Sequence, residues 1–245
     1  MEMNKEKEIN YKSPIYLQLR EVIRNKIDEG EYLPGTAIPS ENDFAEIYGI
    51  NRLTVRNAID ALVNEGMLKS VQGKGVFVSG KKVDHDLETI GGFTQSMQEK
   101  FTSVSTKEIV KSLRSAGEKY ARIFDIDPMD KIYYIKRICY ADKIPISIEE
   151  IFIPQYVVPK LEGIDLSVFS LGEVYNFYGI QINHAVQSLD LTKLEQKDKR
   201  FLGIDTDLAV MLLESTNYDV KERVIEYNRT YARSDKCNFN VNFHR

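Results

Sequence analysis

The chain has 245 residues, 42% hydrophobic and 29% charged, which is the composition of a soluble protein with enough apolar residues for two domain cores. No apolar run approaches the roughly 18 residues of a membrane helix, and the charged start MEMNKEKEIN is unlike a signal peptide, so a cytoplasmic protein is expected. In that compartment Cys139 and Cys237 are expected to be free thiols. The three histidines are scattered, so neither a metal site nor a cofactor is expected.

The net charge of −4 is distributed unevenly along the chain. Residues 1–50 carry six Lys or Arg against ten Asp or Glu, and residues 83–245 are also net acidic. Residues 51–82 carry six basic side chains against two acidic ones. Because the local density of charge matters more for phosphate contact than the total, this basic stretch is a candidate nucleic-acid surface.

Three helices are predicted. Two of them precede the basic stretch, and the third lies within it. Residues 14–29 place apolar side chains at helical spacing. A second, short helix is predicted to begin at Ser40, which can cap it. The third helix is predicted over residues 51–66, with an apolar stripe on one face. The connection between the second and third helices is only two or three residues long, which is typical of a helix-turn-helix unit.

A hairpin is predicted directly after the third helix. The β-prone stretches MLKSV and VFVSG are joined by QGKG at residues 72–75, whose two glycines suit a tight turn. These glycines do not lead into a helix, so QGKG is not a nucleotide-binding loop. Three helices and a hairpin make a winged helix, and residues 1–78 are therefore predicted to be a DNA-binding domain.

The rest of the chain has a different pattern. Residues 79–87 are polar and are predicted to be a linker. Residues 88–245 are predicted to form a second domain, with short helices near 116–124, 167–178 and 193–202 between the extended stretches STKEIVKSL, KIYYIKRICYAD, IPISIEEIFIP, IQINHAVQSLDL, DLAVMLLESTNY, VIEYNRTYARS and FNVNFH. An Asp-Lys turn between two of these strands indicates antiparallel pairing. The expected fold class is α+β, with an N-terminal winged helix and a mostly antiparallel sheet in the second domain.

Two arginines mark the candidate reading surface. Arg52 and Arg56 are four residues apart and share the N-terminal half of the third helix with Thr54, away from the apolar stripe. Side chains at this place on a recognition helix reach bases and phosphates in the major groove. A solvated helix face is the alternative for the arginines taken alone. For QGKG the choice is between a plain turn and a wing tip whose Lys74 contacts DNA.

The first 78 residues resemble the winged-helix domain of GntR-type bacterial transcription regulators. The motifs P-S-E, R-x-T-V-R, L-x-x-E-G and G-K-G-x-F-V all stand at the family's spacing. The resemblance implies DNA contacts from Ser40, Asn42, Asn51, Arg52, Leu53, Thr54, Arg56, Gln72, Gly73, Lys74 and Gly75. Asn42 stands where the family usually has an arginine that contacts guanine, so the operator is expected to differ at that position.

Residues 88–245 resemble the UTRA effector domain of the HutC branch of that family, which has a chorismate-lyase-like fold. IKRICYADKIPISIEEIFIP at 135–154, EYNRTYARSDKCNF and the loop GGFTQSMQEK at 91–100 carry this resemblance. It implies an effector pocket of the kind that binds a sugar or sugar phosphate. Its expected contact residues are Thr94, Ser96, Arg137, Glu149, Ser170 and Glu226.

The position of Arg137 suggests a special role independently of the family resemblance. It is predicted to lie on a central strand between apolar neighbours, where a guanidinium needs an anionic partner. That partner is either a ligand or a carboxylate of the next strand, Glu149 or Glu150. Cys139 and Ala232 stand where phosphate-binding relatives have a second arginine and a tyrosine. They share strand parity with pocket residues, which favours a less highly charged ligand or a different way of holding phosphate.

The sequence thus predicts a transcription regulator, favoured as a repressor, whose hold on a palindromic operator is controlled by a small carbohydrate-type metabolite. A homodimer is expected because one winged helix makes too few contacts for a specific site. No membrane partner and no enzymatic activity are expected. The alternatives are a chorismate-lyase-like enzyme in the second domain, or a second domain that only dimerises a constitutive DNA binder.

Overall fold

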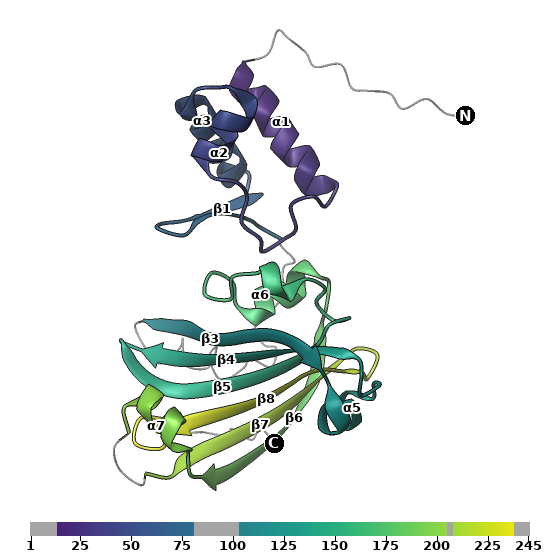
Figure 1. Cartoon of the computed structure of the whole chain (residues 1–245), viewed down its shortest axis with the longest axis vertical. Coiled ribbons are helices and arrows are strands. Elements are labelled where there is room, and N and C mark those ends of the chain that lie inside the picture. Colours follow the sequence, from purple (N-terminus) through teal and green to yellow (C-terminus); the bar gives the residue numbers. More distant parts are fainter. Residues whose placement is uncertain (1–13, 81–102, 205–207, 238–245) are drawn as a thin grey trace, which may run out of the picture. The chain divides into compact units, whose positions relative to one another are not determined.

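The computed structural model describes residues 14–80, 103–204 and 208–237. The chain divides into two compact units, one of residues 1–83 with Gly163–Phe177 and one of residues 84–162 with Tyr178–Arg245 (Figure 1). Residues 163–177, which belong to the predicted second domain, are grouped with the winged helix by their contacts in this structure, and the predicted domain bounds stay a prediction. Thr94, Ser96, the stretch FNVNFH and most of the predicted linker lie outside the described residues.

The first unit contains the predicted three helices and hairpin: α1 (Ile15–Asp28), α2 (Glu41–Tyr48), α3 (Arg52–Asn64), β1 (Leu68–Val71) and β2 (Gly75–Val78). Ser40 and Asp43 form a capping box at the start of α2, each side chain accepting a hydrogen bond from the other residue's backbone N–H. The Asn51 side chain caps α3 by accepting from the Leu53 N–H at 2.7 Å. Gly49 ends α2 in the left-handed conformation, with φ of 62°. These local signals set the tight turn between α2 and α3.

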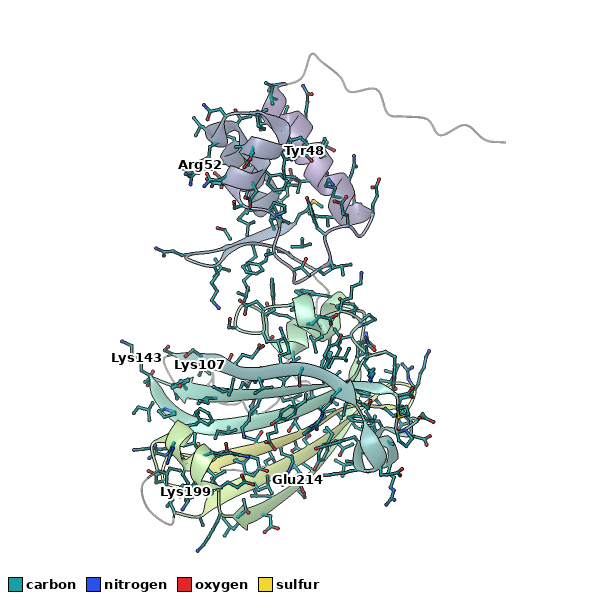
Figure 2. All side chains as sticks on the ribbon, viewed as in Figure 1. Tyr48, Arg52, Lys107, Lys143, Lys199 and Glu214 are labelled. Atoms are coloured by element: carbon teal, nitrogen blue, oxygen red, sulfur yellow. The ribbon has the colours of Figure 1, made fainter. Side chains whose placement is uncertain are left out.

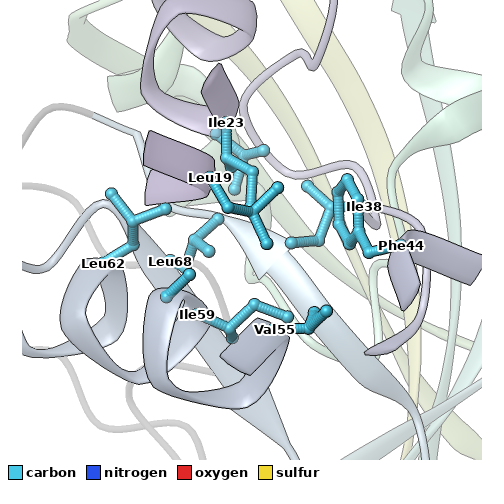
Figure 3. Packing of buried hydrophobic residues seen from close by; sticks show 10 residues of the cluster. Leu19, Ile23, Ile38, Phe44, Val55, Ile59, Leu62 and Leu68 are labelled. Atoms are coloured by element: carbon cyan, nitrogen blue, oxygen red, sulfur yellow. The ribbon is translucent and has the colours of Figure 1, made fainter. Parts of the chain in front are cut away.

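The core of the first unit is formed by one apolar face from each helix (Figure 3). Its buried residues are Leu19, Ile23, Ile38, Phe44, Val55, Ala58, Ile59, Leu62, Leu68 and Val78. Val55, Ile59 and Leu62 form the predicted stripe of α3, so the opposite side of that helix is left to solvent.

The segment 163–177 adds the helix α6 (Leu171–Phe177) to the first unit; the 3₁₀ turn η1 (Leu161–Gly163) precedes it. Phe169 is buried and meets Phe77 of β2 edge to face, with ring centroids 6.0 Å apart. Ser170 is the N-terminal cap of α6, where its Oγ accepts from the Glu173 N–H and donates to the Glu173 carboxylate. The sequence predicts Ser170 as an effector contact, and this contact stays a prediction beside the local capping role.

The second unit is a six-stranded antiparallel sheet with the order β3 (Val104–Ser115), β4 (Lys131–Ala141), β5 (Ile144–Pro154), β8 (Val224–Arg233), β7 (Val210–Asp219) and β6 (Ile182–Thr192). The Asp-Lys turn joins β4 to β5 as predicted, with positive φ at Asp142 (48°) and Lys143 (68°). The predicted α+β class is confirmed. No helix of the described part of the chain is long and apolar enough to cross a membrane.

Two short helices, α5 (Gly117–Phe124) and α7 (Gln196–Leu202), cover one face of this sheet, which we call the helix face. Phe124 of α5 packs with Ile132 and Phe152 of the sheet, and Leu202 of α7 packs with Ile138 and Ile148. Lys136 also lies on the helix face, where its Nζ is 2.8 Å from both carboxylate oxygens of Asp198 on α7. This buried ion pair ties α7 to the middle of β4. The opposite face carries Arg137, and we call it the arginine face.

Candidate DNA-reading surface and candidate effector face

Arg52 and Arg56 project from the first half of α3 and are held by one carboxylate. Arg52 Nε donates to Glu41 Oε2 at 2.8 Å, while Arg56 donates from Nε to Oε1 and from Nη2 to Oε2, each at 2.9 Å. The two arginine side chains are 58% and 48% exposed. Figure 2 shows Arg52 at the outer surface of the helical cluster. The pair is thus exposed but fixed in orientation.

Glu41 is a member of this surface that sequence reasoning missed. Hydrogen bonds from Arg56 and then from Arg52 lower its pKa from 4.5 to about 2, so the carboxylate is ionised at neutral pH. An acidic residue in the first turn of a helix is already explained by its favourable interaction with the helix N-terminus. The sequence therefore gives no sign of a second role for Glu41. Only the turn between α2 and α3 brings residue 41 beside residues 52 and 56.

The other predicted DNA contacts around α3 fall into two groups. Leu53 is 62% exposed, Asn42 is exposed and Thr54 is half-buried, so these side chains can face a groove. Ser40 and Asn51 are also exposed, but their side-chain oxygens already cap α2 and α3. Their contribution is therefore to position the helices. Direct contact of all five residues with DNA stays a prediction.

The wing tip is exposed at all four predicted positions, Gln72, Gly73, Lys74 and Gly75. Gly73 and Gly75 have φ of 75° and 119°, which favour glycine. Lys74 Nζ lies 3.5 Å from Asp165 Oδ2 and also bonds to Ser167 Oγ, both from the segment 163–177 of the same compact unit. The wing lysine is thus paired with a carboxylate in this structure.

On the arginine face, Arg137 and Glu149 are directly opposite each other on β4 and β5. Arg137 Nε donates to Glu149 Oε2 at 2.5 Å, and the two residues are only 9% and 4% exposed. Burial disfavours the charged guanidinium, but the adjacent Glu149 carboxylate outweighs it, and the pKa of Arg137 is raised. Of the two carboxylates considered from the sequence, Glu149 is the partner, while Glu150 lies 3.4 Å from Lys136 on the helix face.

Glu226, another of the predicted effector contacts, lies on the same face and is surrounded by amides. Its Oε1 accepts from Asn217 Nδ2 at 2.9 Å and from Asn228 Nδ2 at 2.7 Å. Ser215 Oγ donates to Asn217 Oδ1 at 2.9 Å and extends the row along β7. The structure thus adds Asn217, Asn228 and Ser215, which sequence reasoning missed because their grouping depends on the register of β7 against β8.

One end of the arginine face is apolar. Cys139 and Ala232 are 1% and 0% exposed and belong to a cluster with Cys237, Met211 and Leu213. Ser147 stands opposite both Cys139 and Ala232, is fully buried, and its Oγ has no hydrogen-bond partner in the described part of the chain. The face therefore combines a row of carboxylate, guanidinium and amide groups with an apolar end.

Known protein families match two parts of the chain, and the second part includes residues 163–177. Residues 15–78 match the bacterial regulatory proteins of the gntR family, and residues 102–238 match the UTRA domain. The HTH-type transcriptional repressor NagR of Bacillus subtilis (strain 168) is 30% identical over 239 residues, which cover 98% of this chain and 97% of NagR. The chain belongs to the GntR family. Its UTRA domain is consistent with the HutC branch, and as a GntR-family protein it is a DNA-binding transcription regulator.

Other relatives of this GntR-family regulator are more distant. The mannosyl-D-glycerate transport/metabolism system repressor MngR of Escherichia coli (strain K12) is 25% identical, over 93% of this chain and 95% of MngR. The crystal structure of PhnF from Mycobacterium smegmatis has a TM-score of 0.59 at 23% identity, covering 92% of this chain and 98% of PhnF. At that identity the match supports the fold alone.

Proposed function

We propose that this GntR-family regulator is a repressor that holds its operator as a homodimer and releases it when a carbohydrate-type metabolite binds the arginine face. The observation that carries the proposal is the buried polar row formed by Arg137, Glu149 and Glu226 with the amides around Glu226. A fold needs no such row for stability, because buried ionic groups rarely add more than well-packed apolar ones. Polar groups gathered on one face suit a ligand with many hydroxyls.

The names of the relatives support repression and this ligand class. NagR and MngR are both named as repressors, and MngR is named for a mannosyl-glycerate system. A third relative, from Shigella flexneri, is named a probable fructoselysine utilization operon transcriptional repressor and is 23% identical over 93% of this chain. Mannosyl-glycerate and fructoselysine are both sugar derivatives. We extend that class, and not a particular compound, to this chain.

We further propose that the effector carries little negative charge. The two positions where phosphate-binding relatives have arginine and tyrosine are Cys139 and Ala232, inside an apolar cluster. Among the described residues away from the strand ends, this face carries two cations, Arg137 and Lys111, against three carboxylates, Glu108, Glu149 and Glu226. The excess of negative charge would repel a dianion. A free sugar or sugar derivative fits this balance of charge better than a sugar phosphate.

The test begins with DNA selected from a random-sequence library as the operator, followed by a thermal-shift panel of free and phosphorylated sugars. At roughly 100-fold excess over Kd, an effector adds about 2.7 kcal/mol to stability, which raises Tm by roughly 5 to 10 °C. The same compound is expected to weaken operator binding at least roughly tenfold. Glu226→Gln should lose both responses and still bind DNA, while Arg122→Ala, a change at an exposed residue of α5, should keep both.

Other outcomes would assign a different function. A larger response to sugar phosphates than to free sugars would overturn the low-charge proposal. No response to any compound would favour a domain that only dimerises. Conversion of a panel compound by the purified protein would favour an enzyme of the chorismate-lyase-like kind.

A further inference from the structure

Strand β6 lies at one edge of the sheet in the second unit (Figure 1). Its ladder partner is β7, from Ile182 opposite Asp219 to Thr192 opposite Val210. No other strand of the described part of the chain pairs with β6 on its outer side. Such an edge presents a row of backbone N–H and C=O groups that can pair with another strand.

This edge strand also exposes large apolar side chains. Val186 on the helix face is 59% exposed, and Leu189 and Leu191 on the arginine face are 54% and 67% exposed. Every residue of 186–191 is exposed, whichever face it occupies. Large apolar side chains in a row along an unpaired edge indicate a surface that another chain covers.

The edge strand on the other side of the same sheet, β3, has the features of a strand that stays exposed to solvent. β3 carries the charged residues Lys107, Glu108, Lys111 and Arg114, and its ladder has a bulge between Glu108 and Val110. Charged side chains and bulges are the usual protection against edge-to-edge pairing. β6 has neither lysine nor arginine, and Asp190 is its single carboxylate. The irregularity in its ladder lies between Ile182 and His184, outside the exposed segment 186–191.

We propose that β6 pairs with β6 of a second copy of this chain, antiparallel about a two-fold axis at Gln187. In that register His184 stands opposite the partner's Asp190, and the same contact is repeated on the other side of the axis. An imidazole N–H can donate to a carboxylate in this pair. Asp190 Oδ1 accepts from the Leu191 N–H at 2.7 Å, and Oδ2 has no partner among the residues that the structure describes.

Other positions of the two-fold axis give Asp190 a less suitable residue opposite it. An axis at Asp190 would place two carboxylates against each other, which is destabilising. An axis at Ser188 would place Asp190 opposite Val186, and one at Leu189 would place it opposite Ser188. Only the axis at Gln187 brings the carboxylate to the histidine.

The same register also matches side-chain size. Ala185 then stands opposite the partner's Leu189, and Val186 opposite the partner's Ser188, so that a small residue faces each larger one. Gln187 faces itself across the axis and can exchange amide hydrogen bonds. Because the strand complements itself in both charge and size, a second copy is the partner that we assign. This inference rests on the homodimer of the proposed function and specifies where its two subunits meet.

A disulfide tests the register directly. Directly opposite residues of an antiparallel pair have Cα atoms about 4.5 to 5.5 Å apart, within reach of a disulfide. Gln187→Cys should therefore form a covalent dimer under mild oxidation, seen on a non-reducing gel. Leu189→Cys should not, because its two copies would be offset by four residues, or about 14 Å. The native Cys139 and Cys237 are buried, and the unmodified protein serves as the control.

A second pair of variants tests the interface between the two β6 strands, which we call the seam, without cross-linking. Leu189→Lys should weaken dimerisation at least roughly tenfold in a sedimentation series, because it places a charge two residues from the two-fold axis, against the partner's Ala185. Leu113→Lys is the matched control, since Leu113 is 42% exposed on the opposite edge strand and should leave dimerisation unchanged.

Failure of this inference is distinguishable from failure of the proposed homodimer. A wild-type dimer that survives Leu189→Lys and shows no cross-link at Gln187→Cys would place the interface elsewhere on the chain. A wild-type protein that remains monomeric at all concentrations would refute both the homodimer and this seam.

Discussion

Glu41 and Arg56 are joined by two hydrogen bonds across the turn between α2 and α3, from Nε to Oε1 and from Nη2 to Oε2, each at 2.9 Å. Arg52 Nε donates to the same carboxylate at 2.8 Å. One acidic side chain thus orients both arginines of the recognition helix and offsets their mutual repulsion. Because Glu41 engages the Nε of each arginine, the terminal nitrogen Nη1 of each stays available for a base or phosphate.

Glu41→Gln is expected to reduce discrimination between operator and random DNA by roughly tenfold. The arginines would lose the ion pairs that orient them, while removal of a negative charge would favour unspecific phosphate contact. Fluorescence anisotropy with both DNAs measures the ratio of the two affinities. An unchanged ratio would mean that Glu41 does not position the arginines for base contact.

The ion pair also predicts a dependence of stability on pH. The pKa of Glu41 is about 2 in the folded chain against 4.5 for the unperturbed group, so its stabilising contribution is present above pH 4.5 and is lost as the pH falls towards 2. Glu41→Gln should therefore be less stable than the wild type at pH 7, and the difference should shrink below pH 4.5. Urea denaturation at several pH values measures this, and a difference independent of pH would contradict it.

Arg52→Ala and Arg56→Ala should each weaken operator binding by about 1 to 3 kcal/mol without unfolding the protein. Arg122→Ala removes the same charge from an exposed site on α5 and should leave the affinity unchanged. Gel shifts with the selected operator compare the three variants. Equal affinities for all of them would mean that the arginines of α3 only form a solvated face.

Lys74→Ala should weaken binding to all DNA sequences alike and lower the slope of log K against log salt concentration by about 1, as expected for loss of one phosphate contact. Asp165→Asn should have the opposite effect on affinity, because Asp165 is the carboxylate that pairs with Lys74 at 3.5 Å. Titrations at four salt concentrations measure both effects. A salt slope that does not change in Lys74→Ala would exclude the wing lysine from phosphate contact.

Arg137→Met should destabilise the chain by about 3 to 5 kcal/mol, because it leaves the Glu149 carboxylate buried without its ion-pair partner. The double variant Arg137→Met with Glu149→Leu should recover most of that loss, since both charges are then absent. Urea midpoints of the two single variants and the double variant give the coupling energy. A cost below about 1 kcal/mol for Arg137→Met would show that the ion pair is not a structural element and that Arg137 chiefly serves the ligand.

The sequence by itself determined the local elements of this protein. Capping residues such as Ser40 and Asn51, the apolar stripe of α3 and the Asp-Lys turn act over a few residues, so their effect can be derived from spacing. The basic stretch, the order of helices and hairpin, the α+β class and the family motifs followed from the same short-range patterns.

Only the tertiary structure decided which distant side chains meet. The choice of Glu149 over Glu150 as the partner of Arg137 depends on the register of β4 against β5, and the amides around Glu226 depend on the register of β7 against β8. The role of Glu41 depends on the angle between two helices, and that of Asp165 on the packing of segment 163–177 beside the wing. Strand register and helix packing are set by how whole apolar faces bury, so no short pattern in the sequence specifies them.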